Sequence, residues 1–232
     1  MPRHGRWAGP PSPPPAGVAD GAARPCIYVL AGTNGAGKSS LAGAAWERHG
    51  ADYFNPDAAA RLIAARDPGL GQAEANSAAW HQGRRLLERA SAERLTFAFE
   101  TTLGGATITA LLERGLANRL EVRVWYVGLD SPERHLARVR ARVARGGHDI
   151  PEATVRRRFH TSRLNLIRLL PRLTELRVYD NSAEADPQAG AAPEPLLVLH
   201  VARGRIVASG PLAATPAWAK PIVAAAMKTS SA

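Results

Sequence analysis

The chain has 232 residues, of which 45% are hydrophobic, so its length and composition favour one domain with a sizeable core plus tails. No apolar run approaches the length of a membrane-spanning helix, and no apolar signal-peptide core opens the chain, so insertion into a membrane and export are not expected. The single cysteine, Cys26, excludes a disulfide framework and is typical of the reducing cytoplasm.

The formal net charge is +10, which raises the question of nucleic acid. Ten arginines lie between residues 134 and 168, where Asp149 and Glu152 are the acidic residues and Phe159 is the aromatic one. A surface that stacks single-stranded nucleic acid uses several aromatic side chains. We therefore expect the arginine cluster at 134–168 to bind a polyphosphate substrate rather than nucleic acid.

Residues 1–24 are rich in proline, with a near-continuous proline run at 10–15, and have no hydrophobic period. This composition predicts a disordered leader or local polyproline II structure. A proline-recognition motif is the alternative, and a dispensable leader is favoured over it. The leader is expected to precede one domain at 25–232.

A short apolar run at 26–31 predicts a buried strand, and residues 40–49, closed by Gly50, predict a helix. Between them stands a complete G-x-x-x-x-G-K-[ST] phosphate-loop motif. Backbone N–H groups in such a loop bind phosphate oxygens at a helix N-terminus, its lysine reaches the β- and γ-phosphates, and its serine hydroxyl binds Mg²⁺. The motif predicts an ATP site with Mg²⁺ bound at Ser39. The alternative, a glycine-rich turn with a chance lysine, is disfavoured because both flanks are correct. The predicted nucleotide-binding residues are Gly32, Thr33, Asn34, Gly35, Ala36, Gly37, Lys38, Ser39 and Ser40.

Residues 53–54 form a brief extended piece, after which Asn55 is a suitable N-cap with Pro56 in the first helical position. Asp57 then lies in the first turn of the helix. It can serve merely to complement the helix dipole, or it can be a general base facing the phosphate loop. Spacing alone leaves these two interpretations about even.

A helix is predicted at 72–94 and a central strand at 95–99, followed by Glu100 and two threonines. The carboxyl ends of strands line the ligand crevice in open α/β sheets. We therefore expect Glu100 and Thr102 to face Mg²⁺ or substrate hydroxyls, in preference to a solvated strand end. Another helix is predicted at 106–116.

The next strand is predicted at 122–129, and a helix begins after the N-cap Ser131. Glycines at 146–147 separate this helix from a second one at 151–170. A basic helix pair with a glycine hinge predicts a closing lid at about 132–170, which would bring arginines onto the transferring phosphoryl group. The arginines that share one helix face are Arg134, Arg138, Arg142 and Arg145. The alternative is a solvated, charged helix pair, which the scarcity of acidic partners disfavours.

The pattern continues with a strand and turn at 177–182, a polar loop at 183–195 and a hairpin at 196–208. Trp218 and the apolar pair at 222–223 are consistent with a short final helix. Alternation of strands with helices predicts an α/β fold of the P-loop kinase type: an open, mostly parallel sheet with helices on both faces and an arginine-rich helical lid.

Several segments, in this order, resemble the zeta toxin family, and more closely its short chromosomal zeta-like P-loop members. The resemblance covers about residues 25 to 182. The segments are Ala31–Ser39, Asn55–Asp57, Phe99–Thr102, Tyr126–Glu133, Arg138–Val139 with Arg142–Val143, Gly146–Glu152, Arg156–Phe159 and Tyr179–Ser182.

This resemblance implies an ATP-dependent phosphotransferase that modifies the 3′-hydroxyl of the sugar in UDP-N-acetylglucosamine, and an antitoxin protein as partner. By motif, Asp57 matches the base that receives the hydroxyl proton, and Glu100 and Thr102 match the substrate-facing strand end. Arg138, Arg142 and Arg145 are the best candidates for phosphate contacts, and Arg157 is a further one.

Two other hypotheses about the function remain open. One keeps the kinase fold with a different acceptor: a nucleoside, an antibiotic or a polynucleotide. The other is a nucleotide-dependent nucleic-acid-binding protein, whose binding would weaken steeply with salt. A motor or transporter ATPase is disfavoured, because Asp130 follows its strand as the start of a helix rather than as a magnesium ligand.

Overall fold

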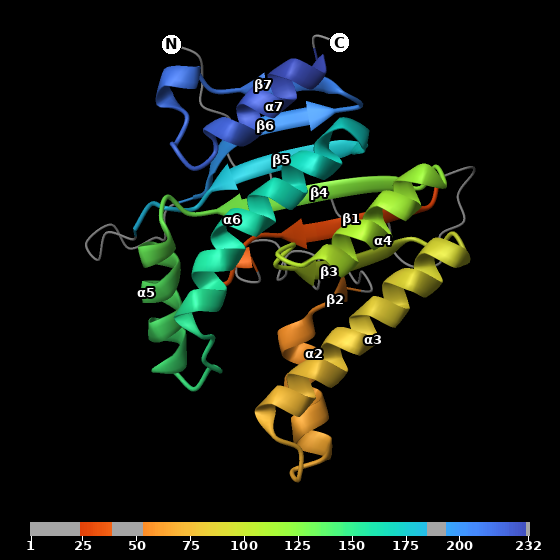
Figure 1. Cartoon of the computed structure of the whole chain (residues 1–232), viewed down its shortest axis with the longest axis vertical. Helices are drawn as coiled ribbons and strands as arrows, with labels where there is room; N and C mark the ends of the chain where they lie inside the picture. The colour runs from red at the N-terminus through yellow and green to blue at the C-terminus, as the bar shows by residue number, and fades with distance from the viewer. Residues whose placement is uncertain (1–23, 39–52, 185–193, 231–232) are drawn as a thin grey trace.

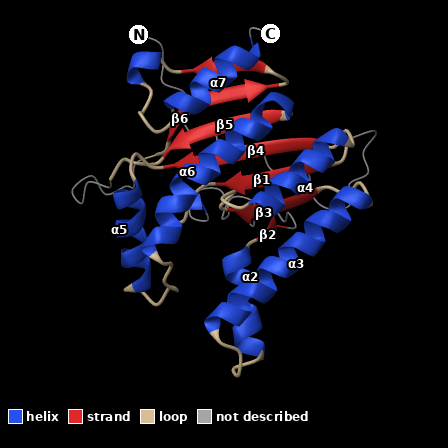
Figure 2. Cartoon of the chain, viewed as in Figure 1, coloured by secondary structure: helices blue, strands red, loops and turns tan. Residues whose placement is uncertain are grey.

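The computed structural model describes residues 24–38, 53–184 and 194–230. Its centre is a seven-stranded sheet with the strand order β2-β3-β1-β4-β5-β6-β7 (Figures 1 and 2). The strands are β1 (Cys26–Ala31), β2 (Tyr53–Phe54), β3 (Phe97–Thr101), β4 (Glu121–Gly128), β5 (Glu175–Asp180), β6 (Leu196–Ala202) and β7 (Arg205–Ser209). The first five are parallel, and β6 and β7 are added antiparallel. The predicted open, mostly parallel α/β fold is confirmed.

The described helices are α2 (Pro56–Arg66), α3 (Gln72–Ala92), α4 (Ala106–Ala117), α5 (Pro132–Val143), α6 (Glu152–Leu169) and α7 (Lys220–Ser230). Short 3₁₀ turns occupy Leu170–Arg172 and Leu212–Ala214. Figure 1 shows α6 crossing the sheet diagonally, with its N-terminal half beside α5 beyond the strand ends. No helix in these ranges is long and apolar enough to cross a membrane.

The larger apolar core joins one face of the sheet to α4, α6 and α7. Leu112, Leu166 and Ile222 from these helices are fully buried in it against strand residues such as Val124 and Val178. Residues on the other face, including Tyr28 and Trp125, form a second cluster, in which these two rings stack at 5.8 Å. The sheet is therefore apolar on both faces, as the continuous hydrophobic runs of its central strands require.

Most predicted elements are confirmed within a residue or two, and the third strand as a whole is shifted by two residues toward the C-terminus. It was expected at 95–99 and lies at Phe97–Thr101. The cause is the end of α3, where Arg94 adopts a positive φ of 53° and the Leu95 N–H bonds back to the Ala90 carbonyl. This turn uses the residues that the prediction assigned to the strand, and it places Glu100 inside β3.

The two N-caps are as predicted. The Asn55 side chain accepts hydrogen bonds from the backbone N–H groups of Asp57 and Ala58, and the Ser131 hydroxyl accepts one from Arg134. The hairpin expected at 196–208 is formed by β6 and β7. The leader at 1–24, apart from Arg24, and the helix at 40–49 are predictions that lie outside the described residues.

Candidate active site

The loop after β1 has the backbone that a phosphate-binding loop needs. Gly32, Gly35 and Gly37 adopt φ angles of 145°, 81° and 85°, which side-chain-bearing residues rarely adopt. Space is limited as well, because a Cβ at Gly32 would lie only 2.1 Å from the Val127 carbonyl oxygen. Glycine is therefore required at these turns by both torsion and space.

Residues from α5 and from the end of β5 make hydrogen bonds to the backbone of this loop. His135 Nδ1 lies 2.7 Å from the Asn34 carbonyl oxygen, and the Asn181 amide donates to the Ala36 carbonyl at 2.9 Å. The fit is tight, because a Cβ at Gly37 would lie 2.6 Å from Asn181 Nδ2. The loop is thus fixed by side chains that come from about 100 and 145 residues further along the chain.

The ring of His135 is a neutral part of this support. Burial lowers the pKa of His135 to about 4, and the positive charges of Lys38 and Arg138 act in the same direction. The hydrogen bond to the Asn34 carbonyl opposes the shift. At neutral pH the imidazole therefore carries one proton, which it donates from Nδ1 to that carbonyl.

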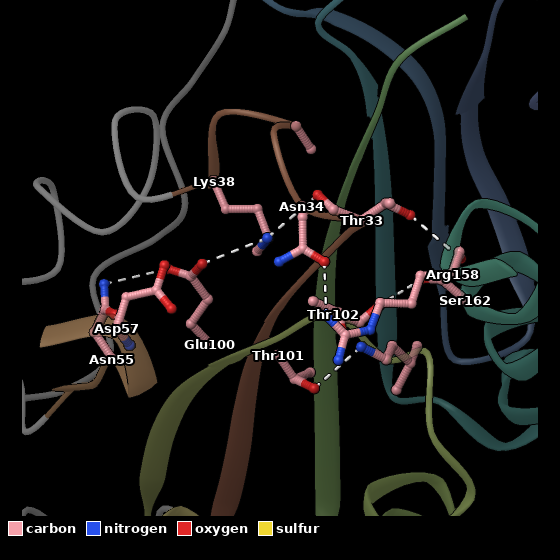
Figure 3. Close-up of polar contacts among 12 residues, drawn as sticks. Thr33, Asn34, Lys38, Asn55, Asp57, Glu100, Thr101, Thr102, Arg158 and Ser162 are labelled. Atoms are coloured by element: carbon pink, nitrogen blue, oxygen red, sulfur yellow. Dashed lines mark hydrogen bonds and ion pairs between the residues drawn. The ribbon is translucent and has the colours of Figure 1, made fainter. Parts of the chain in front are cut away.

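Lys38 and Glu100 meet where β1 and β3 end side by side. Lys38 Nζ lies 3.4 Å from Glu100 Oε1 and 3.4 Å from the Thr33 carbonyl oxygen (Figure 3). The strand register brings them together, since Leu30 pairs with Glu100. Tyr53 donates its hydroxyl hydrogen to the same carboxylate at 2.7 Å. Both charges are well buried, with 6% and 11% of their side chains exposed.

Asp57 lies in the first turn of α2, and Arg142 of α5 reaches it. Arg142 Nη1 is 3.4 Å from Asp57 Oδ2, and Arg142 Nη2 donates to the His148 carbonyl at 3.1 Å. Because the Asn55 cap holds the N-terminus of α2, the Asp57 carboxylate stays on the side of the helix that faces the loop and Glu100 (Figure 3).

A cavity of about 1240 Å³ connects these groups. Its wall includes residues from the loop, the first turn of α2, the end of β3, both lid helices and α3. The structure therefore brings most predicted site residues together. Those that line the cavity are Asn34, Gly35, Gly37, Lys38, Asp57, Glu100, Thr102, Arg138, Arg142, Arg145 and Arg157. Ser39 and Ser40 lie outside the described residues.

The predicted arginines differ in what they contact. Arg138 donates to the Asn181 carbonyl at 2.8 Å, and Arg142 contacts Asp57. Arg145 lies in the turn after α5, is exposed, and donates to the Ala141 carbonyl in the last turn of that helix at 3.1 Å. Arg138 and Arg142 are thus held close to the loop and the carboxylate, whereas Arg145 lies at the rim.

The expectation that the lid arginines have few acidic partners is wrong. Most of the partners come from outside the span that the count covered, and Glu152, which was counted, pairs with two arginines. The ion pairs are Arg134 with Asp130 and Glu184, Arg140 with Glu152, Arg156 with Glu133 and Glu152, and Arg168 with Glu113. Many of the lid arginines are therefore solvated and paired with carboxylates. The number of arginines in the lid does not tell how many of them face the cavity.

Sequence reasoning missed Arg158. Arg158 belongs to a run of three arginines at 156–158, in which Arg157 was the predicted phosphate contact. Arg157 is exposed, whereas Arg158 Nη1 donates to the Asn34 side chain at 2.8 Å and the stem of Arg158 packs against Gly104. Burial, together with the charge of Arg157, lowers the pKa of the Arg158 guanidinium. The helical register could have found it, since buried Val155 and Phe159 flank Arg158 on α6.

Among the described residues, no three His, Cys, Asp or Glu side chains converge as a metal site would require. The described part of the site therefore offers Glu100, Asp57 and threonine hydroxyls as separate oxygen donors, not a preassembled metal cage. Its chemistry is that of a phosphate loop facing two carboxylates and several arginines.

Two solved structures are similar in fold. The crystal structure of AvrRxo1-ORF1:AvrRxo1-ORF2 with sulphate ions matches with a TM-score of 0.62 at 17% identity, over 80% of this chain and 61% of that one. The PezAT chromosomal toxin-antitoxin system of Streptococcus pneumoniae matches with a TM-score of 0.50 at 14% identity, over 77% of this chain and 78% of that one. This chain thus spans about three-fifths of the AvrRxo1 chain that it matches.

Two comparisons concern the sequence itself. An uncharacterized protein of Haemophilus influenzae is 32% identical over 140 residues, which are 55% of this chain and 88% of that protein. Residues 27–161 match the AAA domain family, from the first strand into the second lid helix. This match covers more than half of the chain and carries the phosphate loop within a kinase-like sheet, so the protein belongs to the AAA domain family.

Proposed function

We propose that this protein is an ATP-dependent small-molecule kinase that phosphorylates the sugar 3′-hydroxyl of UDP-N-acetylglucosamine or a related UDP-sugar. One observation carries the kinase assignment: Lys38 of the phosphate loop, the carboxylate of Asp57 and the arginines of the lid line the same cavity. A phosphoryl donor and an alcohol acceptor need these groups side by side. The acceptor identity rests on the resemblance to the zeta toxin family.

The phosphates of ATP would lie in the loop formed by residues 32–40. The glycine torsions leave room for phosphate oxygens beside the backbone N–H groups, and Lys38 would bind the β- and γ-phosphates. Mg²⁺ would be held by Ser39, and the carboxylate and hydroxyl oxygens at the end of β3 belong to the donor type it prefers. When bound, the ion neutralises phosphate charge. An AvrRxo1-ORF1:-ORF2 structure with ATP supports a nucleotide in this fold.

Asp57 would accept the proton of the acceptor hydroxyl. The hydroxyl oxygen forms the new bond to the γ-phosphorus as the bond to the β,γ-bridging oxygen breaks, and ADP leaves with that electron pair. Glu100 and Thr102 would position the sugar, since both line the cavity at the end of β3. Glu100 is held by Tyr53 and by Lys38, so its carboxylate has a fixed orientation.

The arginines would stabilise charge on the transferring group. Arg142 lies beside Asp57, and Arg138 lies next to the loop, where its Nη1 is 3.8 Å from the position of a Cβ on Gly37. Arg145 would contact phosphate only if the lid closes further, because it lies at the rim. Arg158 is added to this set, since it already contacts the loop through Asn34.

The domain from residue 25 onward would act as one kinase unit with its lid at about 132–170. The PezAT structure is described as a toxin-antitoxin system, and AvrRxo1-ORF1 is paired with ORF2. By analogy, we propose that a small antitoxin-like protein binds this chain.

The test is incubation of the purified full chain with ATP, Mg²⁺ and a panel of UDP-sugars, followed by mass analysis of the products. A gain of one phosphoryl group on UDP-N-acetylglucosamine is expected. Lys38→Ala should abolish product, and Asp57→Asn should lower kcat by about 10²- to 10⁴-fold, the usual contribution of a general base.

Asp67→Asn is the matched control, because Asp67 is an exposed carboxylate at the opposite end of α2. It should leave turnover unchanged. Near wild-type turnover in Asp57→Asn would contradict the base assignment. Product from a nucleoside or an antibiotic, with none from any UDP-sugar, would contradict the acceptor and retain the kinase. Salt-sensitive nucleic-acid binding without phosphoryl transfer would contradict the kinase itself.

A further inference from the structure

The cavity extends well beyond the groups that phosphoryl transfer uses. Pockets for single small ligands are usually about 300–1000 Å³. This one measures about 1240 Å³ and continues past Asp57 along one face of α3. The α3 residues that line it are Ala73, Asn76, Ser77, Trp80, Gly83 and Arg84. They recur at spacings of three and four, so they form a continuous wall opposite the lid.

Trp80 differs from the other residues of this wall, which are small or polar, because its large apolar side chain is exposed and lines the cavity. It is 40% exposed and belongs to none of the core clusters of the described residues. Its ring contacts His81, the next residue, edge-on at 4.9 Å between centroids. Packing of the core therefore does not explain an indole at this position.

The position of Trp80 is fixed by the turn that follows it. A Cβ at Gly83 would lie 2.5 Å from Phe54 Cε1, so the Phe54 ring packs directly against the backbone of α3. Phe54 is itself paired with Phe99 in the sheet register. This contact ties the backbone of the α3 wall to the same strand end that carries Glu100.

We propose that the α3 wall, defined by Asn76, Ser77, Trp80 and Arg84, is the binding site for the nucleobase of the acceptor, with the base stacked on Trp80. The inference rests on the proposed kinase function and states how its UDP-sugar would be recognised. Stacking on an aromatic side chain is a usual way to hold a base. The next observations favour a base over a plain sugar or an apolar acceptor.

Hydrogen-bonding groups lie one helical turn from the indole. Asn76 and Ser77 precede Trp80 by four and three residues, so their side chains lie beside it on the helix surface. The side-chain oxygen of Asn76, Oδ1, accepts a hydrogen bond from the Gln72 side chain at 3.0 Å, which leaves the Asn76 Nδ2 hydrogens for other partners such as the carbonyl oxygens of a pyrimidine edge. An apolar acceptor would not use them.

Two arginines line the same cavity as the indole. Arg84 follows Trp80 by one turn, and Arg61 comes from α2; both line the cavity. Arg84 pairs with Glu88 at 3.1 Å, but both side chains are about 40% exposed, so this pair is weak and Arg84 can turn toward a ligand. A nucleotide-linked sugar presents a diphosphate between its base and its sugar, and arginines that line the same cavity as Trp80 and Asp57 suit that charge.

The test compares the full chain with its Trp80→Ala and Trp80→Phe variants, using UDP as the probe for the wall and ADP as the probe for the loop. Binding of UDP and ADP is measured by isothermal titration calorimetry, tryptophan fluorescence is recorded in parallel, and KM and kcat are measured with UDP-N-acetylglucosamine. Loss of one base–ring stack corresponds to about 5- to 140-fold in affinity. Leu62→Ala is the matched control, because Leu62 is an exposed apolar residue on α2 away from the cavity lining.

We expect Trp80→Ala to weaken UDP binding and raise KM for the UDP-sugar within that range, with kcat and ADP affinity unchanged. Trp80→Phe should retain binding within about threefold, since a ring remains, but should lose the fluorescence response. Leu62→Ala should resemble wild type.

Unchanged KM and UDP affinity in Trp80→Ala, in a protein that phosphorylates the UDP-sugar, would overturn the stacking site and leave the proposed function standing. A Trp80-dependent UDP response in a protein that transfers no phosphoryl group would support the base site and contradict the proposed kinase. Absence of any UDP response in the wild type would overturn the stacking site outright.

Discussion

Replacement of Arg158 by alanine should affect both stability and turnover, whereas replacement of its neighbour Arg157 should affect neither strongly. Arg158 donates to the Asn34 side chain at 2.8 Å, and its stem lies against Gly104. Arg157 is exposed at the cavity rim. The two residues are adjacent arginines on one helix, so the comparison holds charge and helix propensity constant.

The magnitude follows from the kind of contact. A hydrogen bond with a charged partner contributes about 1.5–3 kcal/mol, and we take the lower end because Arg158 is only half-buried. A loss of about 1.5 kcal/mol corresponds to a Tm decrease of about 3–6 °C for a domain of this size. Arg157→Ala should stay within about 0.5 kcal/mol of wild type, as exposed substitutions usually do.

Urea and thermal unfolding of Arg158→Ala, Asn34→Ala and the double variant measure this contact directly. If the hydrogen bond exists, the double variant loses less than the sum of the two single losses, by about 1–2 kcal/mol. Strict additivity would refute the contact. Equal kinase activities in Arg157→Ala and Arg158→Ala would refute the view that Arg158 is the arginine that serves the loop.

Three further predictions concern the support of the site. The free energy of unfolding should fall as the pH drops from about 6.5 to about 4, because His135 binds a proton in the unfolded chain but stays neutral in the folded one. The full loss is about 3 kcal/mol. His135→Phe should flatten this pH dependence when unfolding in urea is measured. Gly128→Val should lower Tm strongly, since even a Cβ would lie 2.4 Å from the Trp218 ring, and an unchanged Tm would show that the ring moves freely. Ser162→Ala should cost about 1–3 kcal/mol by leaving the buried Tyr126 hydroxyl without its acceptor, and adding Tyr126→Phe should recover part of that loss in the same unfolding assay.

The sequence predicted those parts of the structure that local rules decide. The caps at Asn55 and Ser131 need only a side chain and the N–H groups two or three residues later, so they were found. The loop glycines and the flanking strand follow from a contiguous motif. The displaced start of β3 shows the limit of this approach, because the turn at Arg94 depends on a left-handed residue that is not glycine.

Parts of the site that depend on contacts between distant segments were not predictable. Asp57 and Arg142 are 85 residues apart, and His135 reaches the loop across 101 residues. A charge count along the chain could not show that Arg134 is neutralised by Glu184 while Arg158 is free of an acidic partner at salt-bridge distance among the described residues. Such distinctions need the tertiary positions of the partners.

The phosphate loop and the α3 wall, at the two ends of the cavity, are held by different elements of the fold. This difference decides which residues can be substituted without disturbing the loop. The phosphate loop is held by α5 and by the end of β5, with glycines that leave no room for change. The α3 wall is carried by the α2–α3 pair, which joins the sheet through β2 and through Leu87 and Ala90 of α3, both buried in the larger core (Figure 1). Substitutions on α3 therefore disturb few contacts of the loop. On the proposed role of the α3 wall, substitutions there would change acceptor preference while nucleotide binding stays intact, and relatives with the same loop would not need to share an acceptor.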